Sequence, residues 1–228
     1  ANRKHDCDIL IDQNFYERME KRYSKLIPSF CEKFLGPKFT LLKPEFLKAR
    51  KNLKRKNEFK RILISFGGSD PSNETTKALS AIIDLGKKYK IDVIVGTNNP
   101  NKKQIMKLCS KFPFCDFYEQ VENISKYMKK ADLALGAGGS TTWERCCLGL
   151  PTIVVNLSKD QEKITENLSK IGCVINLGSA EKTTKLDYVK ALNEINSKKL
   201  REISKKCLVL VDGKGVKRIE NKIFQAGN

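Results

Sequence analysis

The chain has 228 residues, of which 40% are hydrophobic and 31% are charged, so it can bury the core of one domain or at most two. It contains no run of 18 apolar residues and no apolar segment near its start, so we expect neither a transmembrane helix nor a signal peptide. Its 44 Lys and Arg against 26 Asp and Glu give a formal net charge of +18, which fits an anionic ligand, nucleic acid, a membrane surface or simply a solvated basic surface.

The eight cysteines contain no Cys-x-x-Cys pair and His5 is the single histidine, so the sequence offers no zinc-ligand spacing. We therefore expect no metal and no cofactor. Most thiols should be buried and reduced. Reduced cysteines are typical of a cytoplasmic protein.

The first sixty residues predict few regular elements. Pro44 suits the first turn of a helix, and Leu42, Phe46 and Leu53 fit one apolar face. The expected elements are a strand at 8–11, a loop or weak helix at 17–26, a strand at 31–35, a helix at 44–51 and a charged connector at 51–60.

The dense group of basic residues lies between Lys43 and Lys60. Proteins that bind single strands place aromatic side chains among their charges, whereas Phe46 and Phe59 are the only aromatic residues in this block. We expect this basic block to be solvated surface beside the connector, with no nucleic acid as partner.

From Arg61 onward, apolar strands alternate with amphipathic helices. This α/β pattern predicts a Rossmann-like parallel sheet with helices on both faces and a C-terminal helical extension. In such sheets ligands bind outside the carboxyl ends of the strands, so the loops after the strands are the candidate binding segments. The predicted strands are 61–66, 92–95, 114–118, 133–136, 151–155 and 174–177, and the predicted helices are 74–89, 101–110, 124–130, 142–148, 161–171, 186–194, 198–210 and 216–225.

The first candidate loop, residues 65–73, carries two adjacent glycines, of which Gly68 is the second; they let the backbone approach a ligand closely. Ser69, Ser72 and Asn73 can cap the following helix or donate to an anionic group at its N-terminus. A plain turn from strand to helix needs only one glycine and a cap, and the sequence leaves this alternative open.

The second candidate loop, residues 136–144, reads Gly-Ala-Gly-Gly-Ser-Thr-Thr-Trp-Glu. Small residues followed by hydroxyls at a helix start form a nest of N–H donors suited to a diphosphate, although the spacing is neither that of a P-loop nor GxGxxG. Glu144 lies four residues after Ser140 on the same helical face, where its carboxylate could accept both hydroxyls of a ribose. A glutamate in a first helical turn also serves as a dipole or capping-box partner, and both interpretations stay open.

The third candidate loop, residues 156–161, ends at Asp160 and Gln161. Both side chains could reach a sugar in the same cleft. Alternatively, Asp160 caps the helix that follows.

The run from Gly136 to Thr152 resembles the nucleotide-sugar hydrolases of pseudaminic acid biosynthesis, which act on UDP-2,4-diacetamido-2,4,6-trideoxy-β-L-altropyranose. Residues 5–14, 41–46 and 67–73 resemble segments of the same family in the same order. The likeness covers residues 1–178. A more distant resemblance is to the transferase that adds GlcNAc in peptidoglycan synthesis.

This resemblance implies the C-terminal half of a GT-B fold, in which two Rossmann-like domains enclose the active site. Residues 1–58 would be an interdomain signature and linker that pack on a UDP-binding domain, residues 59–228. The N-terminal catalytic domain, with its glycine-flanked histidine, would be absent. His5 lacks that glycine context, so we expect no catalytic residue in this chain, although Asp160 could assist.

The resemblance also implies roles for individual residues in the UDP half of the site. The nest of Gly139, Ser140 and Thr141 would bind the diphosphate, and Glu144 would hold the ribose hydroxyls. Uracil would meet backbone groups near Val121, with its neighbours Glu122 and Asn123.

The sugar would meet Gln161. The hydrolases usually carry Asn-Gln where this chain has Asp160-Gln161, and an aspartate accepts but cannot donate a hydrogen bond. Gly68, Ser69 and Asn73 of the first loop complete the set of expected UDP- or substrate-binding residues.

The expected function is therefore the UDP-sugar-binding domain of a nucleotide-sugar hydrolase, with a UDP-sugar and the absent domain as its partners. One alternative is the donor-binding domain of a GT-B glycosyltransferase, which shares the fold and the UDP site. A second alternative, based on the charge of +18 alone, is a non-enzymatic module that binds anions.

Overall fold

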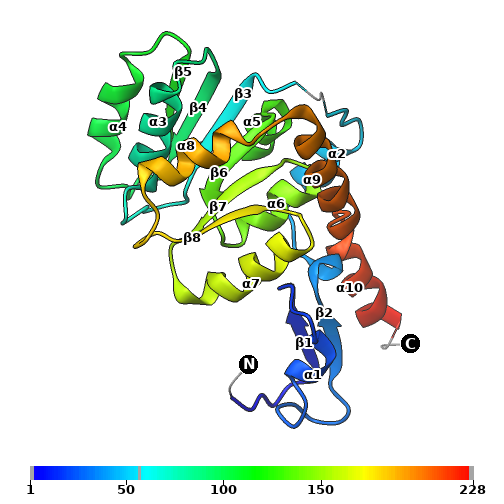
Figure 1. Cartoon of the computed structure of the whole chain (residues 1–228). Coiled ribbons are helices and arrows are strands. Elements are labelled where there is room, and N and C mark those ends of the chain that lie inside the picture. The colour runs from blue at the N-terminus through cyan, green and yellow to red at the C-terminus, as the bar shows by residue number, and fades with distance from the viewer. Residues whose placement is uncertain (1–2, 56–57, 226–228) are drawn as a thin grey trace.

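The computed structural model describes residues 3–55 and 58–225 and has a six-stranded parallel sheet at its centre (Figure 1). The strand order is β5-β4-β3-β6-β7-β8, so the order reverses between β3 and β6. The carboxyl ends of the strands point toward the lower left of Figure 1. The strands are β3 (Arg61–Ser65), β4 (Lys90–Val95), β5 (Cys115–Glu119), β6 (Leu133–Ala137), β7 (Thr152–Asn156) and β8 (Ile175–Ser179).

The sheet is buried on both faces, because each central strand sends alternate side chains to two separate cores. In β3, Ile62 and Ile64 enter one core and Leu63 the other. In β7, Ile153 and Val154 divide in the same way. The first core includes residues of α3, α4 and α8, and the second includes residues of α2, α5, α6 and α7. Helix α9 contributes to both.

The helices follow the strands as the sequence predicts, with shifts of one or two residues at most ends. The largest difference is at α3, which ends at Asp84 instead of Tyr89, because Gly86 takes a left-handed conformation (φ 62°) that stops the helix. The helices are α2 (Pro44–Arg50), α3 (Glu74–Asp84), α4 (Lys102–Cys109), α5 (Ile124–Lys130), α6 (Thr141–Cys147), α7 (Lys159–Lys170), α8 (Lys185–Asn193), α9 (Ser197–Leu210) and α10 (Gly215–Gln225).

A small second sheet precedes the domain and projects from it at the bottom of Figure 1. Its strands β1 (Ile9–Asp12) and β2 (Glu32–Leu35) pair in parallel around the short helix α1 (Met19–Arg22), and β2 leads into the 3₁₀ turn η1 (Pro37–Phe39). The region expected to be a loop or weak helix is thus mostly turns with one short helix. Phe15, just before this region, is joined to α7 by a hydrogen bond of 3.3 Å from the Asn167 side chain to its carbonyl oxygen.

The prediction that the basic block is solvated surface is correct for Lys48, Lys51 and Lys54, which are exposed, but wrong for Arg50 and Arg55. Arg50 donates to the carbonyl oxygens of Cys147, Leu208 and Val211, at the C-terminal ends of α6 and α9. Carbonyls at a helix end lack helical partners and carry partial negative charge, so they attract cations.

Arg55 makes the same kind of contact with the ends of α5 and α6. Its guanidinium donates to the carbonyls of Met128, Ala131 and Leu148 at 2.9, 2.5 and 2.8 Å. Burial lowers the pKa of Arg55 to about 10. Because this value is still well above 7, the group is charged at neutral pH. Together with the fully buried Phe46, the two arginines attach residues 44–55 to the helices on one face of the sheet.

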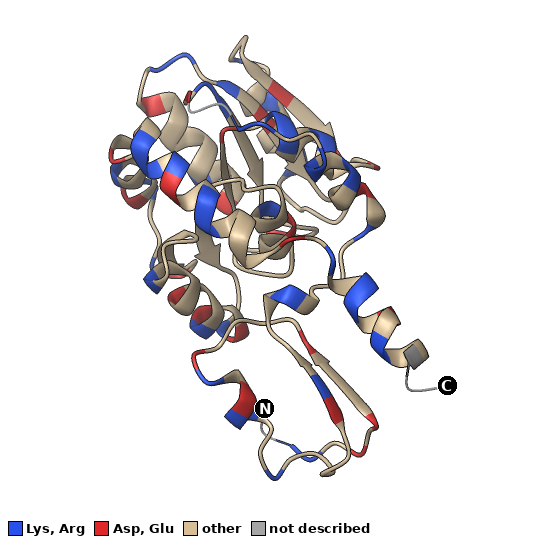
Figure 2. Ribbon diagram, turned by 90° about the vertical axis from the view of Figure 1, so that its right-hand side faces the viewer, with Lys and Arg blue, Asp and Glu red and all other residues tan. Residues whose placement is uncertain are grey.

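The cysteines match the expectation of mostly buried thiols. All eight are free and six of them are buried. Across the described residues, no helix is both long and apolar enough to span a bilayer. Lys and Arg lie on many helices and loops, with Asp and Glu among them (Figure 2).

We predict that Arg55→Met lowers the free energy of unfolding by about 2–4 kcal/mol, because three helix-end carbonyls lose a charged donor. The matched control is Lys54→Met, one residue away and exposed, which should change it by less than about 0.5 kcal/mol. Urea unfolding of both variants measures the difference. If both variants lose the same free energy of unfolding, the bonds from Arg55 to the helix ends do not stabilise the fold.

Candidate functional site

The reversal of strand order places the two glycine-rich loops side by side. Ser65 pairs with Gly136 at the carboxyl ends of β3 and β6. Ligands of doubly wound sheets bind where the strand order reverses. A pocket of about 320 Å³ opens there, lined by Ser65, Gly67, Gly68, Ile94, Val95, Gly96, Thr97, Asn98, Gln120, Val121, Ile124, Thr141 and Glu144.

One side of the pocket is the start of α6, where three successive backbone donors are free. The N–H groups of Gly139, Ser140 and Thr141 have no acceptor in the described part of the chain, whereas the N–H of Gly138 is used by the Val155 carbonyl. The Ser140 hydroxyl is exposed and does not cap the helix. The predicted nest therefore offers unused donors to an anion.

Glu144 lines the same pocket beside Thr141 and is half-buried. Its carboxylate has no hydrogen-bond or ion-pair partner among the residues described. Because α6 begins at Thr141, the capping-box position is Trp143, so the capping-box interpretation of Glu144 is wrong. Burial raises the pKa of Glu144, although the nearby charges of Arg145 and Lys43 oppose that shift.

The first loop contributes backbone rather than side chains. Gly68 lines the pocket, but the prediction that Ser69, Ser72 or Asn73 caps α3 is wrong. The cap is Asp70, whose carboxylate accepts from the N–H groups of Glu74 and Thr75 at 2.9 Å each. Asp70 caps α3 in preference to the serines because two hydrogen bonds to a buried carboxylate are stronger than one to a hydroxyl.

Six of the expected binding residues do not line this pocket: Ser69, Asn73, Gly139, Ser140, Asp160 and Gln161. Ser69 is exposed beside Gly68. Asn73 begins α3 in a left-handed conformation (φ 54°), and its side-chain oxygen accepts from Thr76 at 2.6 Å. Their direct contact with a ligand remains a prediction.

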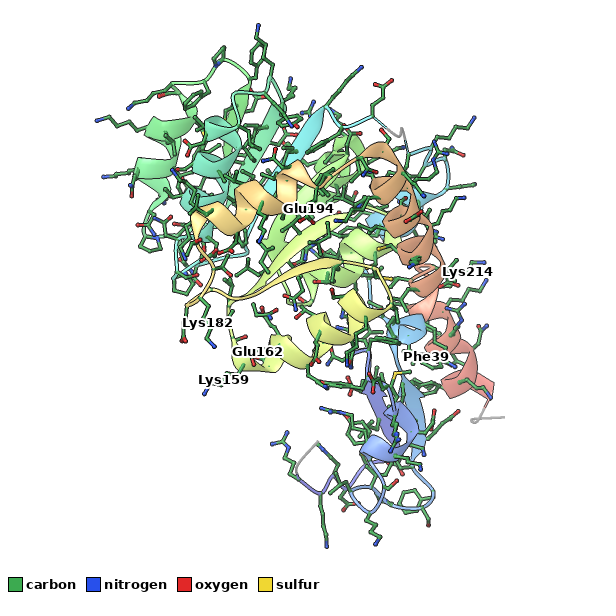
Figure 3. The ribbon with its side chains drawn as sticks, in the orientation of Figure 1. Phe39, Lys159, Glu162, Lys182, Glu194 and Lys214 are labelled. Carbon is green, nitrogen blue, oxygen red and sulfur yellow. The ribbon has the colours of Figure 1, made fainter. Side chains whose placement is uncertain are left out.

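Gln161 reaches the glycine-rich loop from α7. Its side-chain oxygen accepts from the Leu157 N–H at 3.0 Å, and its amide nitrogen lies 3.5 Å from where a Cβ on Gly139 would be. That amide can still donate to a ligand above the loop. Figure 3 shows Lys159, Glu162 and Lys182 on this side of the domain.

Asp160 is exposed on the first turn of α7 and does not cap it. The N-cap residue is Ser158, which makes no side-chain cap, so the capping interpretation of Asp160 is wrong. Asp160 is close enough to Tyr16 for its charge to contribute to the raised pKa of that phenol, whose first cause is burial. The N-terminal segment around Tyr16 therefore approaches the first turn of α7.

The segment after β5 also lines the pocket, in addition to the start of α6 and the loop after β3. Val121 and Gln120 line it, and Gln120 takes a left-handed conformation (φ 48°) while its N–H binds the Val95 carbonyl at 2.9 Å. Asn123 is occupied as the cap of α5, accepting from the Lys126 N–H at 3.3 Å. Of the predicted uracil segment, Val121 therefore lies in the pocket while Asn123 has a structural role.

Sequence reasoning missed the loop after β4, where Gly96, Thr97 and Asn98 line the pocket. The signal was present as Gly-Thr-Asn-Asn-Pro directly after a predicted strand. A Cβ on Gly96 would lie 2.3 Å from the Gly68 carbonyl oxygen. Only a glycine lets these two loops touch.

The pocket thus combines free N–H donors for an anion with a carboxylate that can accept from hydroxyl groups. Among the described residues, no group of three or more His, Cys, Asp or Glu could hold a metal ion. A ligand carrying both phosphate and sugar hydroxyls fits this chemistry.

Residues 61–222 match the glycosyltransferase family 28 C-terminal domain. The chain belongs to this family. It is 29% identical over 189 residues to the spore coat polysaccharide biosynthesis protein SpsG of Bacillus subtilis (strain 168), covering 81% of this chain and 56% of that protein. It is 28% identical over 169 residues to the UDP-2,4-diacetamido-2,4,6-trideoxy-beta-L-altropyranose hydrolase of Campylobacter jejuni subsp. jejuni serotype O:2, covering 74% of this chain and 59% of that enzyme.

Among solved structures, MurG of Acinetobacter baumannii superposes with a TM-score of 0.67 at 15% identity, over 95% of this chain and 66% of that chain. This likeness confirms the predicted fold, a Rossmann-like sheet of the GT-B type. The family 28 chain spans little more than half the length of the two curated relatives.

We predict that replacing Glu144 by Gln stabilises the family 28 domain at neutral pH. Burial raises the pKa of Glu144 above its ordinary 4.5, so at pH values between the two the folded state holds a proton that the unfolded state has released, and above both the folded state holds the costly buried charge. Wherever the folded state binds more protons, the free energy of unfolding falls as pH rises. The gain from Glu144→Gln should be absent below pH 4.5 and grow as pH rises through the raised value.

Urea unfolding across this pH range measures the gain. The control is Glu202→Gln on α9, the same substitution at a residue that is exposed. If Glu144→Gln raises the free energy of unfolding by the same amount at every pH, the claim that a buried charge at Glu144 destabilises the fold is contradicted.

Proposed function

We propose that this chain is the UDP-sugar-binding part of a nucleotide-sugar hydrolase that releases UDP from a diacetamido-trideoxyhexose. The observation that carries the proposal is the pocket between β3 and β6. Thr141 and the unpartnered carboxylate of Glu144 line this pocket, and the free N–H groups of Gly139 and Ser140 directly precede Thr141 in the chain. Family membership and the two relatives with sugar-related names support a role in polysaccharide or nucleotide-sugar chemistry.

The pocket suggests one orientation for the nucleotide. The diphosphate would lie on the N–H groups of Gly139, Ser140 and Thr141, and the ribose hydroxyls would donate to Glu144. The base would then extend toward Val121 and Gln120, on the opposite wall. The sugar would lie near Gln161, whose amide nitrogen faces the glycine-rich loop.

In the proposed reaction, water adds to the anomeric carbon, and the bond from that carbon to the diphosphate oxygen breaks. UDP leaves with the bonding electrons, and the free N–H groups stabilise the charge on its phosphate. The water gives its proton to a general base. The single histidine, His5, packs near Tyr23 beside the small sheet, with ring centroids 6.1 Å apart, so we assign it no part in this step.

We assign the base to the remaining part of a longer protein, since this chain spans 59% of the hydrolase relative. Residues 1–58 would then join the two halves, and residues 59–228 would hold UDP. Asp160, exposed on the first turn of α7, would contact the sugar or the water from this side.

A second candidate is the donor-binding part of a glycosyltransferase. It is favoured by the family description and by the structural likeness to MurG. Hydrolysis and transfer share the UDP site and differ in whether water or an acceptor hydroxyl attacks. A longer protein that contains this chain and consumes the UDP-sugar without an added acceptor would support hydrolysis, and dependence on an acceptor would support transfer.

We predict that Glu144→Ala weakens UDP binding by about 1–3 kcal/mol, because two charge-assisted bonds to the ribose are lost. Isothermal titration calorimetry with UDP measures this change. Glu202→Ala, on the exposed face of α9, is the matched control and should bind as the unchanged chain does. Unchanged UDP affinity in Glu144→Ala would contradict the ribose assignment.

A further prediction separates binding from catalysis. The chain of 228 residues should bind UDP or the UDP-sugar but release no UDP from it, because the proposed base lies elsewhere. A single-turnover assay with excess chain over substrate detects such release. Release at the rate of a full-length relative would mean that the chain holds its own base.

A further inference from the structure

Arg145 is a buried cation beneath the glycine-rich loop of the pocket. Only 2% of the residue is exposed. One terminal nitrogen, Nη2, donates to the Ala137 carbonyl at 2.6 Å and to the Thr142 hydroxyl at 2.9 Å. The Nε–H group is buried and has no acceptor in the part of the chain that the structure describes.

No carboxylate within the described ranges forms an ion pair with Arg145, and, unlike Arg50 and Arg55, it does not bind a set of helix-end carbonyls in place of one. Arg61 makes two bonds to Asp92, at 2.5 and 2.7 Å. Arg50 instead binds the negative ends of helices. A buried charge without a counterion is costly, and burial lowers the pKa of Arg145 to about 10, so the group stays protonated at neutral pH.

The backbone of β6 makes room for this guanidinium at Gly136. A Cβ at this position would lie 2.7 Å from Nη1 of Arg145 and 2.6 Å from the Ser65 carbonyl oxygen. Gly136 is therefore required for the cation to reach the place where the ends of β3 and β6 meet. Ala137, whose carbonyl oxygen accepts from Arg145, follows Gly136. The three free N–H groups, those of residues 139–141, come after Gly138.

We propose that Arg145 is a positioning residue for an anionic ligand, and that the phosphate charge on the glycine-rich loop is the counterion which Arg145 lacks within the described residues. The cation fixes the loop through Ala137 and Thr142, and its uncompensated charge makes the potential at the free N–H groups more positive. This inference rests on the proposed UDP site and deepens it, because it makes recognition of the diphosphate depend on a residue that does not line the pocket.

A purely structural role would affect every ligand of the pocket equally, whereas an electrostatic role selects for phosphate. The test therefore compares UDP with uridine, which lacks the phosphates, by ligand-observed NMR and calorimetry. Arg145→Gln removes the charge and keeps a polar side chain with N–H donors, although it is too short to reach the partners of Nη2. Arg145→Lys keeps the charge and loses the planar fork.

We expect Arg145→Gln to weaken UDP binding about tenfold or more while uridine binding stays within about twofold. Arg145→Lys should recover part of the preference for UDP. Arg50→Gln is the control: it removes a half-buried arginine from the far end of α6 and should leave the ratio of UDP to uridine affinity unchanged.

If the chain without substitutions binds UDP, the inference is overturned when Arg145→Gln weakens UDP and uridine binding equally or weakens neither. The proposed function survives that outcome. An unchanged chain that binds neither ligand would overturn the proposed function and the inference with it. If Arg145→Gln does not fold, the Lys variant decides, because loss of the preference for UDP with the charge retained would contradict an electrostatic role.

Discussion

The parallel pairing of β3 with β6, with Ser65 opposite Gly136, determines where this domain can bind a ligand. After β3 the chain turns to α3 on one face of the sheet, and after β6 it turns to α6 on the other. The two loops diverge from adjacent strand ends and leave the pocket between them. Trp143 and Cys146 hold α6 in the core, and this packing directs Thr141 and Glu144 toward the opening.

The regular elements were predictable because short continuous apolar strands and amphipathic helices report burial directly. Helix ends were less predictable, since they depend on individual contacts. The end of α3 required the conformation of Gly86, and its start depends on Asp70, which bonds two N–H groups from within the loop. The serines around that aspartate are equally good caps by composition, so sequence alone could not choose among them.

The candidate site was predictable where it is local in sequence and unpredictable where it is assembled by the fold. The run from Gly139 to Glu144 indicated phosphate and hydroxyl binding without the structure, while the contribution of Gly96 depends on its contact with Gly68. Charge was the hardest property to interpret. Arg50, Arg55 and Arg145 look alike in the sequence, yet two bind helix ends and the third lies buried without an acidic partner in the described structure.

The attachment of the linker also determines what counts as a folding unit. The family match begins at residue 61, but Phe46 fills the second core and Arg50 and Arg55 satisfy the ends of α5, α6 and α9. A piece cut at residue 61 would open the surface that Phe46 covers and expose helix-end carbonyls to solvent. Residues 44–55 therefore pack as part of the same body as the sheet, although the family match does not include them.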